Sequence, residues 1–453
     1  MFLCLMMMLG IGWAEVPLAQ SYPECGEPDR PDLCPSDLDE DWSYIGYIPE
    51  KSRESIRDAE LELGSGTSVD LAWRTTLGDW EVVLAVADSG ISWYETQLVN
   101  KVYLNDGELP VPWDALDEEA DSHDANGDGV FNIEDYASDS RVDITAGVDT
   151  ADHLLDPSDL IYTFSDGVDE DENGYEDDIA GWDFFGRDND AYSDFDSGFG
   201  THGTEVMEGA AAEGGDQENG NIGVCPNCSI LPIRIGDTFI TDGSRVAEGI
   251  AFGVDSGASV LGMAVGALSS PDVVGEAIEY AIDMDMVIVA AAGDENSYHH
   301  NLPAMLNNIL YVHSIIHNTG DDDDEVYSYM NTWNCNNFGA RMDFVAPANA
   351  CATGAVAHIT GGVGLLMSAA EAAGYSLTVG EVRQIFIQTV DDVWLTEDEV
   401  SESKAYPSEE GWDPFYGYGR VNVGAAVDLV TAGEIPPWIS IESPRWFATL
   451  DPA

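Results

Sequence analysis

The hydrophobic positions of this chain fall into short continuous runs that end at small or acidic residues. The clearest run is Val82–Ile91 (VVLAVADSGI), in which the apolar residues stop at Asp88 and a Ser-Gly turn. Such a run is typical of a strand that is buried on both faces of a parallel sheet. Ligands of parallel sheets gather at the C-terminal ends of the strands, so Asp88 is expected at a binding edge. The alternative is that Asp88 only caps the following turn.

A glycine-rich loop followed by small residues surrounds the most prominent histidine. Residues 198–209 read GFGTHGTEVMEG, and Ala210–Ala212 continue them as a helical run. Glycines let the backbone approach a ligand closely, and the start of a helix presents free N–H groups and a partial positive charge. We therefore expect His202 to be functional, in preference to an incidental histidine in a surface turn.

A third stretch, Phe344–Leu366, reads as a loop that enters a helix of small residues. Together with ADSG (87–90) and GTHGTE (200–205), it resembles the subtilases, the subtilisin-like serine peptidases, in that family's chain order of Asp, His and Ser. The resemblance covers about residues 69–432. Further segments are similar to the family's other strands and closing helices: Gly223–Ile235, Ala258–Leu268, Val287–Asn296, Leu377–Val393 and Gly417–Val430.

This resemblance implies an α/β fold of three layers, a mainly parallel sheet with helices on both faces. It places a peptidase domain over residues 69–432, with an acidic insertion at about 105–180 that carries calcium-like loops. From the composition of the N-terminus we expect a signal peptide (1–19) followed by an acidic leader (20–68). Residues 433–453 are expected to form a C-terminal tail or the start of a truncated β domain.

The resemblance also assigns roles to single residues. Asp88 and His202 match the aspartate and histidine of the family's catalytic triad. Counting back from Gly361, which closes the family's G-T-S-x-A-x-P-H-V-A-G, the position of the serine nucleophile holds Thr353. The asparagine of the family's A-A-G-N, which stabilises the oxyanion, is replaced by Asp294.

Both replacements affect the expected activity. The extra methyl group of Thr353 stiffens its χ1 angle and crowds the line of attack. Asp294 would repel an oxyanion when ionised and could donate a hydrogen bond to it only when protonated. Two functions follow. One is a slow or acid-shifted endopeptidase that hydrolyses peptide bonds. The other is a pseudopeptidase, a calcium-stabilised scaffold that binds peptides or proteins without cleaving them.

The charge of the chain limits its partners. With 86 acidic and 15 basic residues, the net charge is −71. Nucleic acids and anionic membrane surfaces would be repelled, so neither is an expected partner, whereas a protein or peptide substrate is. Self-repulsion of this size also destabilises a compact state, which implies high salt, bound calcium or both.

Residues 124–135 (DANGDGVFNIED) have the spacing of an EF-hand calcium loop. In such a loop, alternate oxygen ligands converge, a glycine at position 6 allows the sharp turn, and a final carboxylate closes the shell. The loop resembles those of dockerins, with an aspartate in place of the usual final glutamate. The ligands it predicts are Asp124, Asn126, Asp128, the Val130 carbonyl, Asn132 and Asp135. The alternative is a solvated acidic loop.

A second loop, residues 169–178 (DEDENGYEDD), repeats the start of this pattern. Its predicted calcium ligands are Asp169, Asp171 and Asn173, with Asp177 and Asp178 as closing ligands. Calcium in these two loops would brace the insertion and thereby stabilise the protein.

The N-terminus and the cysteines predict export to an oxidising compartment, extracellular or periplasmic. Residues 1–14 form an apolar run that is too short to span a bilayer and suits the core of a signal peptide. Six cysteines follow it, an even number that suits disulfides. Proximity favours the pairs Cys25–Cys34 and Cys335–Cys351. For Cys225–Cys228, a structural bridge is favoured over a metal half-site or a redox pair, since the chain offers no second ligand pair and no thioredoxin-like unit.

Overall fold

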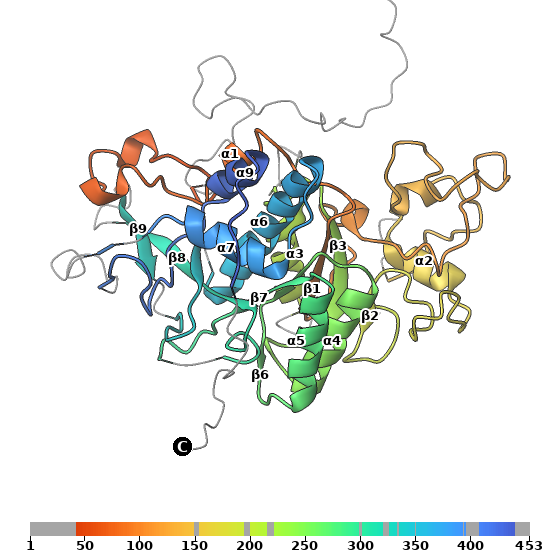
Figure 1. Cartoon of the computed structure of the whole chain (residues 1–453). Helices are drawn as coiled ribbons and strands as arrows, with labels where there is room; N and C mark the ends of the chain where they lie inside the picture. The colour runs from red at the N-terminus through yellow and green to blue at the C-terminus, as the bar shows by residue number, and fades with distance from the viewer. Residues whose placement is uncertain are drawn as a thin grey trace, which may run out of the picture.

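A mostly parallel sheet of eight strands forms the centre of the computed structural model (Figure 1). The strands run in the order β10-β8-β7-β5-β1-β3-β2, and β9 pairs antiparallel with β8. The strands of this sheet are β1 Val83–Asp88, β2 Trp182–Asp183, β3 Ser229–Arg234, β5 Val260–Met263, β7 Val287–Ala291, β8 Ile309–Thr319, β9 Val326–Thr332 and β10 Phe344–Pro347. A small second sheet pairs β4 (Ile240–Thr241) with β6 (Gly266–Ala267). The structure describes residues 42–148, 154–193, 200–214, 222–298, 301–319, 326–332, 335–348, 350–392, 394–395 and 407–439.

Strand β1 lies in the middle of this sheet, parallel to β3 on one side and to β5 on the other. All of its residues are buried. Leu84 and Val86 point into one hydrophobic core, whereas Ala85 and Ala87 point into the other. The continuous apolar run therefore forms the doubly buried strand that the sequence predicts.

Helices cover both faces of the sheet, which confirms the three-layer α/β fold. One core joins the sheet to α1, α3, α6, α7 and α9, and the other joins it to α4 and α5 (Figure 1). The helices are α1 Val69–Ala72, α2 Pro157–Phe164, α3 His202–Ala211, α4 Gly243–Asp255, α5 Asp272–Asp283, α6 Ala352–Ala372, α7 Val379–Thr389 and α9 Val423–Thr431. Short 3₁₀ turns occur at η1 Glu50–Ser52, η2 Asp58–Glu60, η3 Val99–Lys101 and η4 Ile133–Tyr136.

Helix α6 is the central core helix. Within the described part of the chain it is the one helix long and apolar enough to cross a membrane, and 83% of its apolar window is buried inside the fold. Its small residues allow close packing. A Cβ atom at Gly361 would lie 2.6 Å from the carbonyl oxygen of Ala210 on α3, and one at Gly364 would lie 3.0 Å from Leu84 on β1.

The acidic insertion extends outward beyond the β2 and β3 side of the sheet (Figure 1). It is nevertheless attached to the main core, because Ile133, Tyr136 and Leu160 are buried members of the same hydrophobic cluster as α3 and α6. Asn105 N–H also donates to the carbonyl of Ile179 at 2.9 Å, which closes the base of the insertion.

The segment from Trp42 to Ser68 packs next to β9, away from the edge of the sheet that carries the insertion (Figure 1). The buried Glu60 accepts a hydrogen bond from Tyr329 N–H at 2.7 Å. Arg420, which is fully buried, donates to the carbonyls of Leu63 and Gly64 and pairs with Asp391 at 2.6 Å. This N-terminal arm is thus tied to both the sheet and the C-terminal part of the domain.

Two of the predicted disulfides are present, Cys225–Cys228 and Cys335–Cys351. The first is a local bridge, as favoured above. The third predicted pair, Cys25–Cys34, lies outside the described residues, as do the signal peptide, residues 20–41 of the leader and residues 440–453 of the tail. The boundaries of the predicted segments therefore stay predictions.

Candidate active site

Asp88 ends strand β1, where the sheet meets the glycine turn at Ser89-Gly90. The residue is fully buried. Its Oδ1 accepts a hydrogen bond from the N–H of Ser89 at 2.7 Å, whereas Oδ2 has no hydrogen-bond partner among the residues that the structure describes. The carboxyl group is therefore fixed at the C-terminal end of a central strand, the expected position of a functional side chain in a parallel sheet.

His202 is the first residue of α3 and lies directly against Asp88. The distance from His202 Nδ1 to Asp88 Oδ1 is 2.6 Å. The helix approaches the strand this closely because residue 203 is a glycine, whose Cβ atom would otherwise lie 2.3 Å from the carbonyl oxygen of Gly90. Gly203 N–H also donates to the hydroxyl of Ser89 at 3.0 Å, which fixes the start of α3.

Thr353 is the second residue of α6 and reaches the other side of the same imidazole. Its Oγ1 lies 3.1 Å from His202 Nε2. Helices α3 and α6 are in close contact, with the position for a Cβ of Gly209 only 2.9 Å from Ala357 Cβ. The structure thus brings together a carboxylate, an imidazole and a hydroxyl from residues 88, 202 and 353.

The environment of His202 sets its protonation. Burial of the imidazole by itself disfavours the charged form, but the Asp88 carboxylate outweighs this effect and raises the pKa of His202 above its ordinary value. Glu205 and Asp294 act in the same direction. Neutral His202, the form that can accept a proton from a hydroxyl group, therefore predominates only at a pH above this raised pKa.

Asp294 follows β7 and the left-handed Gly293, so that its side chain turns toward the start of α6. Its Oδ1 accepts a hydrogen bond from Ala352 N–H at 3.1 Å, one residue before Thr353. Much of the residue is exposed, yet protein atoms crowd the carboxyl group, and this partial burial raises the pKa of Asp294. Glu295 raises it further. With Oδ1 engaged as an acceptor, Oδ2 is the oxygen that could carry a proton and donate it.

This arrangement can activate a hydroxyl nucleophile. A base within hydrogen-bond distance of a hydroxyl, itself oriented by a third group, is the general geometry of nucleophilic catalysis. His202 lies between Thr353 and Asp88 in this way, and Asp294 flanks Thr353 from the turn after β7.

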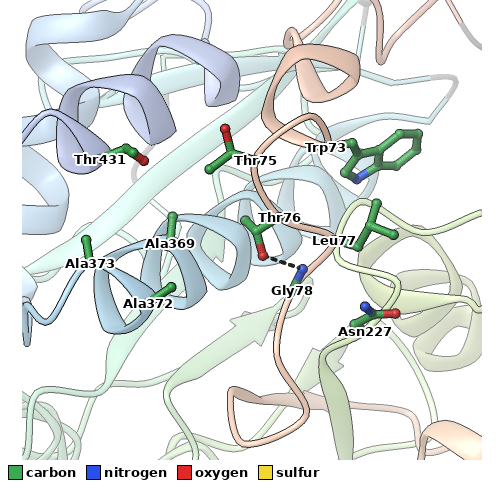
Figure 2. A pocket seen from close by; sticks show the side chains of 10 residues that line it. All are labelled: Trp73, Thr75, Thr76, Leu77, Gly78, Asn227, Ala369, Ala372, Ala373 and Thr431. Atoms are coloured by element: carbon green, nitrogen blue, oxygen red, sulfur yellow. Dashed lines mark hydrogen bonds between the residues drawn. The ribbon is translucent and has the colours of Figure 1, made fainter. Parts of the chain in front are cut away.

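A cavity of about 320 Å³ lies elsewhere, between the loop after α1 and the C-terminal ends of α6 and α9 (Figure 2). Trp73, Ala369 and Thr431 are among the residues that line it, and none of the described residues in its lining has an ionisable side chain. From Thr353 to Ala369, α6 rises roughly 24 Å, at about 1.5 Å per residue. This cavity is therefore separate from the candidate active site.

In the first predicted calcium loop, side-chain oxygens turn inward and accept backbone hydrogen bonds. Asp124 accepts from Gly127 N–H at 2.8 Å, and the buried Asp135 accepts from Ala125 N–H at 2.7 Å. An all-oxygen set of carboxylates, amides and one carbonyl is the donor chemistry that Ca²⁺ prefers. The residues of this loop, from Asp124 through Asn126, Asp128, Val130 and Asn132 to Asp135, fit a calcium ion by this criterion.

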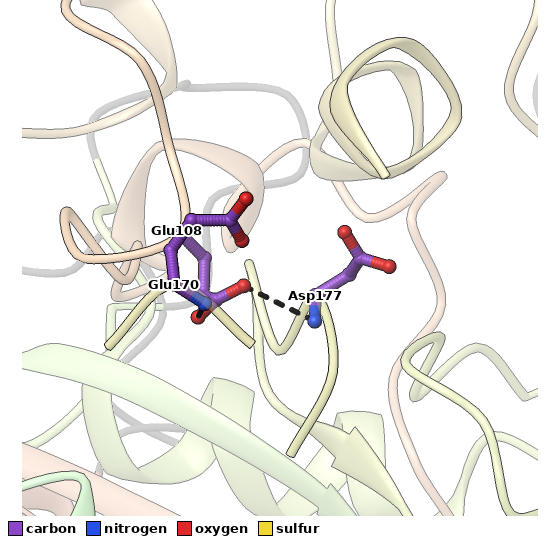
Figure 3. A group of neighbouring side chains, drawn as sticks. All are labelled: Glu108, Glu170 and Asp177. Atoms are coloured by element: carbon purple, nitrogen blue, oxygen red, sulfur yellow. Dashed lines mark hydrogen bonds between the residues drawn. The ribbon is translucent and has the colours of Figure 1, made fainter. Parts of the chain in front are cut away.

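The second loop brings its carboxylates close to a residue from another part of the insertion. Glu108, Glu170 and Asp177 each place one ligand atom within 4.8 Å of the others (Figure 3). The same holds for Glu108, Asp171 and Asp178. Oxygens that share one Ca²⁺ at 2.3–2.6 Å are at most about 5 Å apart, so these groups also fit a calcium ion. Burial, with the neighbouring carboxylates, raises the pKa of Glu108 and of Asp178 to about 7.

Asp169 and Asn173 take part in the turn of this second loop. Asp169 accepts from Asn173 N–H at 3.0 Å and from Gly174 N–H at 2.9 Å. The side-chain amide of Asn173 donates to Asp178 at 3.0 Å. Glu108 and Glu170 are not part of the sequence prediction. Glu108 lies about sixty positions upstream in an unremarkable NDGELP segment, so no spacing signal points to it.

The family of the chain follows from comparison with known proteins. The family model described as the Subtilase family matches residues 79–419, and the chain belongs to this family. It is therefore a subtilisin-like serine peptidase, a hydrolase, by family.

Individual relatives give the same result. Thermitase of Thermoactinomyces vulgaris is 28% identical over 267 residues, which cover 55% of this chain and 81% of thermitase. The thermophilic serine proteinase of Bacillus sp. (strain AK1) is 30% identical, over 55% of this chain and 56% of that protein. The halolysin-like extracellular serine protease Nep of Natrialba magadii is 27% identical, over 54% and 42%.

Among solved structures, the prenylagaramide maturation protease PagA matches with a TM-score of 0.48 and 14% identity, covering 81% of this chain and 99% of PagA.

Proposed function

We propose that this protein is a subtilisin-like endopeptidase that hydrolyses peptide bonds of protein or peptide substrates with Thr353 as its nucleophile. The observation that carries the proposal is the continuous contact from Asp88 to His202 at 2.6 Å and from His202 to Thr353 at 3.1 Å. Membership of the subtilase family supports it. Binding alone does not require an imidazole held between a buried carboxylate and a hydroxyl.

In this mechanism, Thr353 Oγ1 attacks the carbonyl carbon of the peptide bond and His202 Nε2 takes its proton. Asp88 holds the Nδ1–H tautomer and stabilises the imidazolium. The proton then passes to the leaving amine, which leaves an ester between Thr353 and the acyl group. A water molecule, deprotonated by the same imidazole, hydrolyses this ester and restores the hydroxyl.

Asp294 determines how well the tetrahedral intermediate is stabilised. Its carboxyl group can donate a hydrogen bond to the oxyanion only while protonated, and its raised pKa favours that form. An ionised Asp294 would instead repel the oxyanion. Loss of one such donor slows hydrolysis by about 10²- to 10³-fold, so the enzyme is expected to be slow and shifted toward acid.

An assay with unfolded casein tests the proposal. Purified protein with calcium is incubated with casein between about pH 4 and pH 9 and compared with His202→Ala. Turnover that disappears in the variant supports the peptidase. Absence of turnover at every pH, in a protein shown to be folded by circular dichroism, would contradict it.

A second candidate function is a pseudopeptidase that binds peptides or proteins without cleaving them. It is favoured by threonine at the nucleophile position and by the carboxyl group of Asp294, which accepts a hydrogen bond from Ala352. Under this function, the casein assay gives no product, while calorimetry with the same unfolded casein detects binding.

We further propose that Ca²⁺ stabilises the insertion and that the protein is secreted. The two loops described above supply the all-oxygen ligand sets, and the second adds Glu108 and Glu170. Secretion is supported by the disulfides Cys225–Cys228 and Cys335–Cys351, which persist in oxidising compartments. The relative from Natrialba magadii is described as extracellular.

A further inference from the structure

We propose that Asn337 and the Cys335–Cys351 bridge are positioning elements, which together hold the turn that carries Asp294 against the start of α6. This inference rests on the proposed function, because it concerns the distance between the oxyanion residue and the nucleophile Thr353. Neither Asn337 nor the bridge touches the reacting atoms, and both would act through Asp294.

Asn337 is a buried residue whose polar groups contact the Asp294 turn. Its backbone N–H donates to the Gly293 carbonyl at 3.0 Å, and its side-chain Nδ2 donates to the Ala292 carbonyl at 3.0 Å. The same Nδ2 donates to Glu295, and its Oδ1 accepts from Ser297 N–H at 3.2 Å. One side chain thus binds the turn both before and after Asp294.

The Cys335–Cys351 bridge continues this connection to the nucleophile helix. The carbonyl of Cys335 accepts a hydrogen bond from Asn296 N–H at 3.1 Å, in the same turn. Cys351 is the residue directly before α6, and the next residue, Ala352, donates its N–H to Asp294. The bridge and these hydrogen bonds form a closed loop of contacts around the site, and Thr353 is the next residue in the chain.

Ser314 on β8 forms hydrogen bonds with the segment next to Cys335 and with the segment next to Cys351. Asn336, the residue between Cys335 and Asn337, donates its Nδ2 to the Ser314 carbonyl at 2.6 Å. The hydroxyl of Ser314 donates to the Ala350 carbonyl at 2.7 Å, just before Cys351. These two hydrogen bonds therefore fix the Asp294 turn and the start of α6 relative to the sheet.

An asparagine is suited to this role because its side chain donates at one end and accepts at the other. In Asn337→Asp an oxygen replaces Nδ2 and faces the Ala292 carbonyl and the Glu295 carboxylate. Acceptors would then face acceptors, and the turn would move. A displacement of about 1 Å at an active site can slow a reaction by about 10²-fold, and oxyanion stabilisation depends on donors placed within hydrogen-bond distance.

The first test compares Asn337→Asp with Asn331→Asp, a change of another buried asparagine, which lies on β9. For Asn337→Asp we expect kcat to fall by about 10²-fold with KM changed less than threefold, because the displacement affects the transition state and spares substrate binding. For Asn331→Asp we expect kcat to stay within twofold of the wild type. Equal kcat in Asn337→Asp and the wild type would overturn the positioning role.

The second test removes one bridge at a time. Cys335→Ser with Cys351→Ser should lower kcat at least tenfold at a temperature where the variant is fully folded. Cys225→Ser with Cys228→Ser, which removes the local bridge in the segment that connects α3 to β3, should leave kcat within twofold. A similar loss of kcat in the two double variants would mean that each bridge acts only through general stability. That result would contradict the proposal.

Hydrogen exchange separates failure of this inference from failure of the proposed function. The N–H of Ala352 is protected by Asp294, so its exchange should become at least tenfold faster in Asn337→Asp and in the Cys335–Cys351 variant, while protection of β1 is unchanged. This readout requires no turnover, so it tests the positioning even if casein is not cleaved. Unchanged exchange at Ala352 in a folded variant would overturn the inference and leave the peptidase proposal intact.

Discussion

At the residue scale, the proposed site combines two residues of a peptidase triad with a proposed nucleophile of unusual shape. Asp88 and His202 are held by a strand end and by a helix start, whereas Thr353 adds a methyl group beside its hydroxyl. A β-branched side chain has restricted χ1 freedom, and rotation away from a preferred rotamer costs about 0.5–1.5 kcal/mol. This cost falls on the step in which Oγ1 turns from His202 toward the substrate.

The change Thr353→Ser should therefore increase kcat by about tenfold, the equivalent of about 1.4 kcal/mol in the barrier. The serine keeps the hydroxyl 3.1 Å from His202 Nε2 without the methyl group. The effect is measured by steady-state cleavage of a fluorogenic peptide. Thr353→Ala has no hydroxyl group at this position and should not cleave the peptide. A serine variant slower than the wild type would show that the site is built around threonine.

Two pKa shifts predict how activity depends on pH. The pKa of His202 is raised above 6.5, so the neutral base is gained as pH rises. The pKa of Asp294 is raised above 3.8, and its protonated, donating form is lost as pH rises. The product of the two populations is a bell-shaped profile of kcat/KM, in which the fall at high pH comes from Asp294.

In Asp294→Asn, an amide donates at every pH, so the fall at high pH should disappear and the maximum of kcat/KM should rise by about 10²-fold. A series of kcat/KM measurements in constant ionic strength checks both effects, with Glu276→Gln, the loss of an exposed negative charge on α5, as the control. A descending limb that persists in Asp294→Asn would mean that another group causes it.

At the element scale, the site depends on how closely α3 and α6 approach the sheet. Small residues determine this approach: Gly203 faces the turn after β1, and Gly361 faces α3. The surrounding strands and helices hold β1 in place, because β1 pairs with β3 on one side and with β5 on the other and is buried on both faces.

Replacement of Gly203 by alanine should therefore displace His202, because the new Cβ would lie 2.3 Å from the Gly90 carbonyl oxygen. We expect kcat to fall by about 10²-fold and the melting temperature to decrease. Gly275→Ala in α5 is the matched control, since its Cβ meets no atom within 4 Å and alanine favours a helix by about 0.5–1 kcal/mol. Full activity in Gly203→Ala would show that α3 can shift without consequence.

Sequence patterns were sufficient for the elements and for the residues that belong to a local motif. The apolar run before Asp88 predicts β1, and the small residues after Cys351 predict α6, because each pattern reflects burial along a single segment. Sequence patterns do not identify Glu108 or Asn337. Glu108 joins the second acidic loop only through the folding of the insertion, and Asn337 acts through backbone groups of a turn about forty positions away.

At the scale of the whole molecule, charge is the dominant property. A net charge of −71 destabilises any compact state unless ions screen it or bind to it. Screening is weak at low salt, where the Debye length is about 30 Å at 0.01 M, and strong at 1 M, where it is about 3 Å. The acidic clusters of the insertion, with Glu108 and Asp178 buried among carboxylates, concentrate this repulsion.

Removal of calcium at low salt should therefore lower the melting temperature, measured by calorimetry with EDTA and again with excess Ca²⁺. Calcium at about a hundred times its dissociation constant would add about 2.7 kcal/mol to the free energy of unfolding. Glu108→Gln should reduce this gain, whereas Glu276→Gln, an exposed charge on α5, should not. A melting temperature that is the same in EDTA, in Ca²⁺ and in high salt would contradict both the calcium and the salt dependence.

The buried guanidinium of Arg420 has a consequence for how the domain can be shortened. The carbonyls of Leu63 and Gly64 solvate this cation in place of water, and Asp391 provides its counterion. A recombinant chain cut back to Val69 would leave this charged group with two of its three hydrogen-bonding partners missing, which typically costs several kcal/mol. The segment before the region that matches the family therefore contributes to the fold, and truncations made for crystallisation or display should keep Trp42–Ser68.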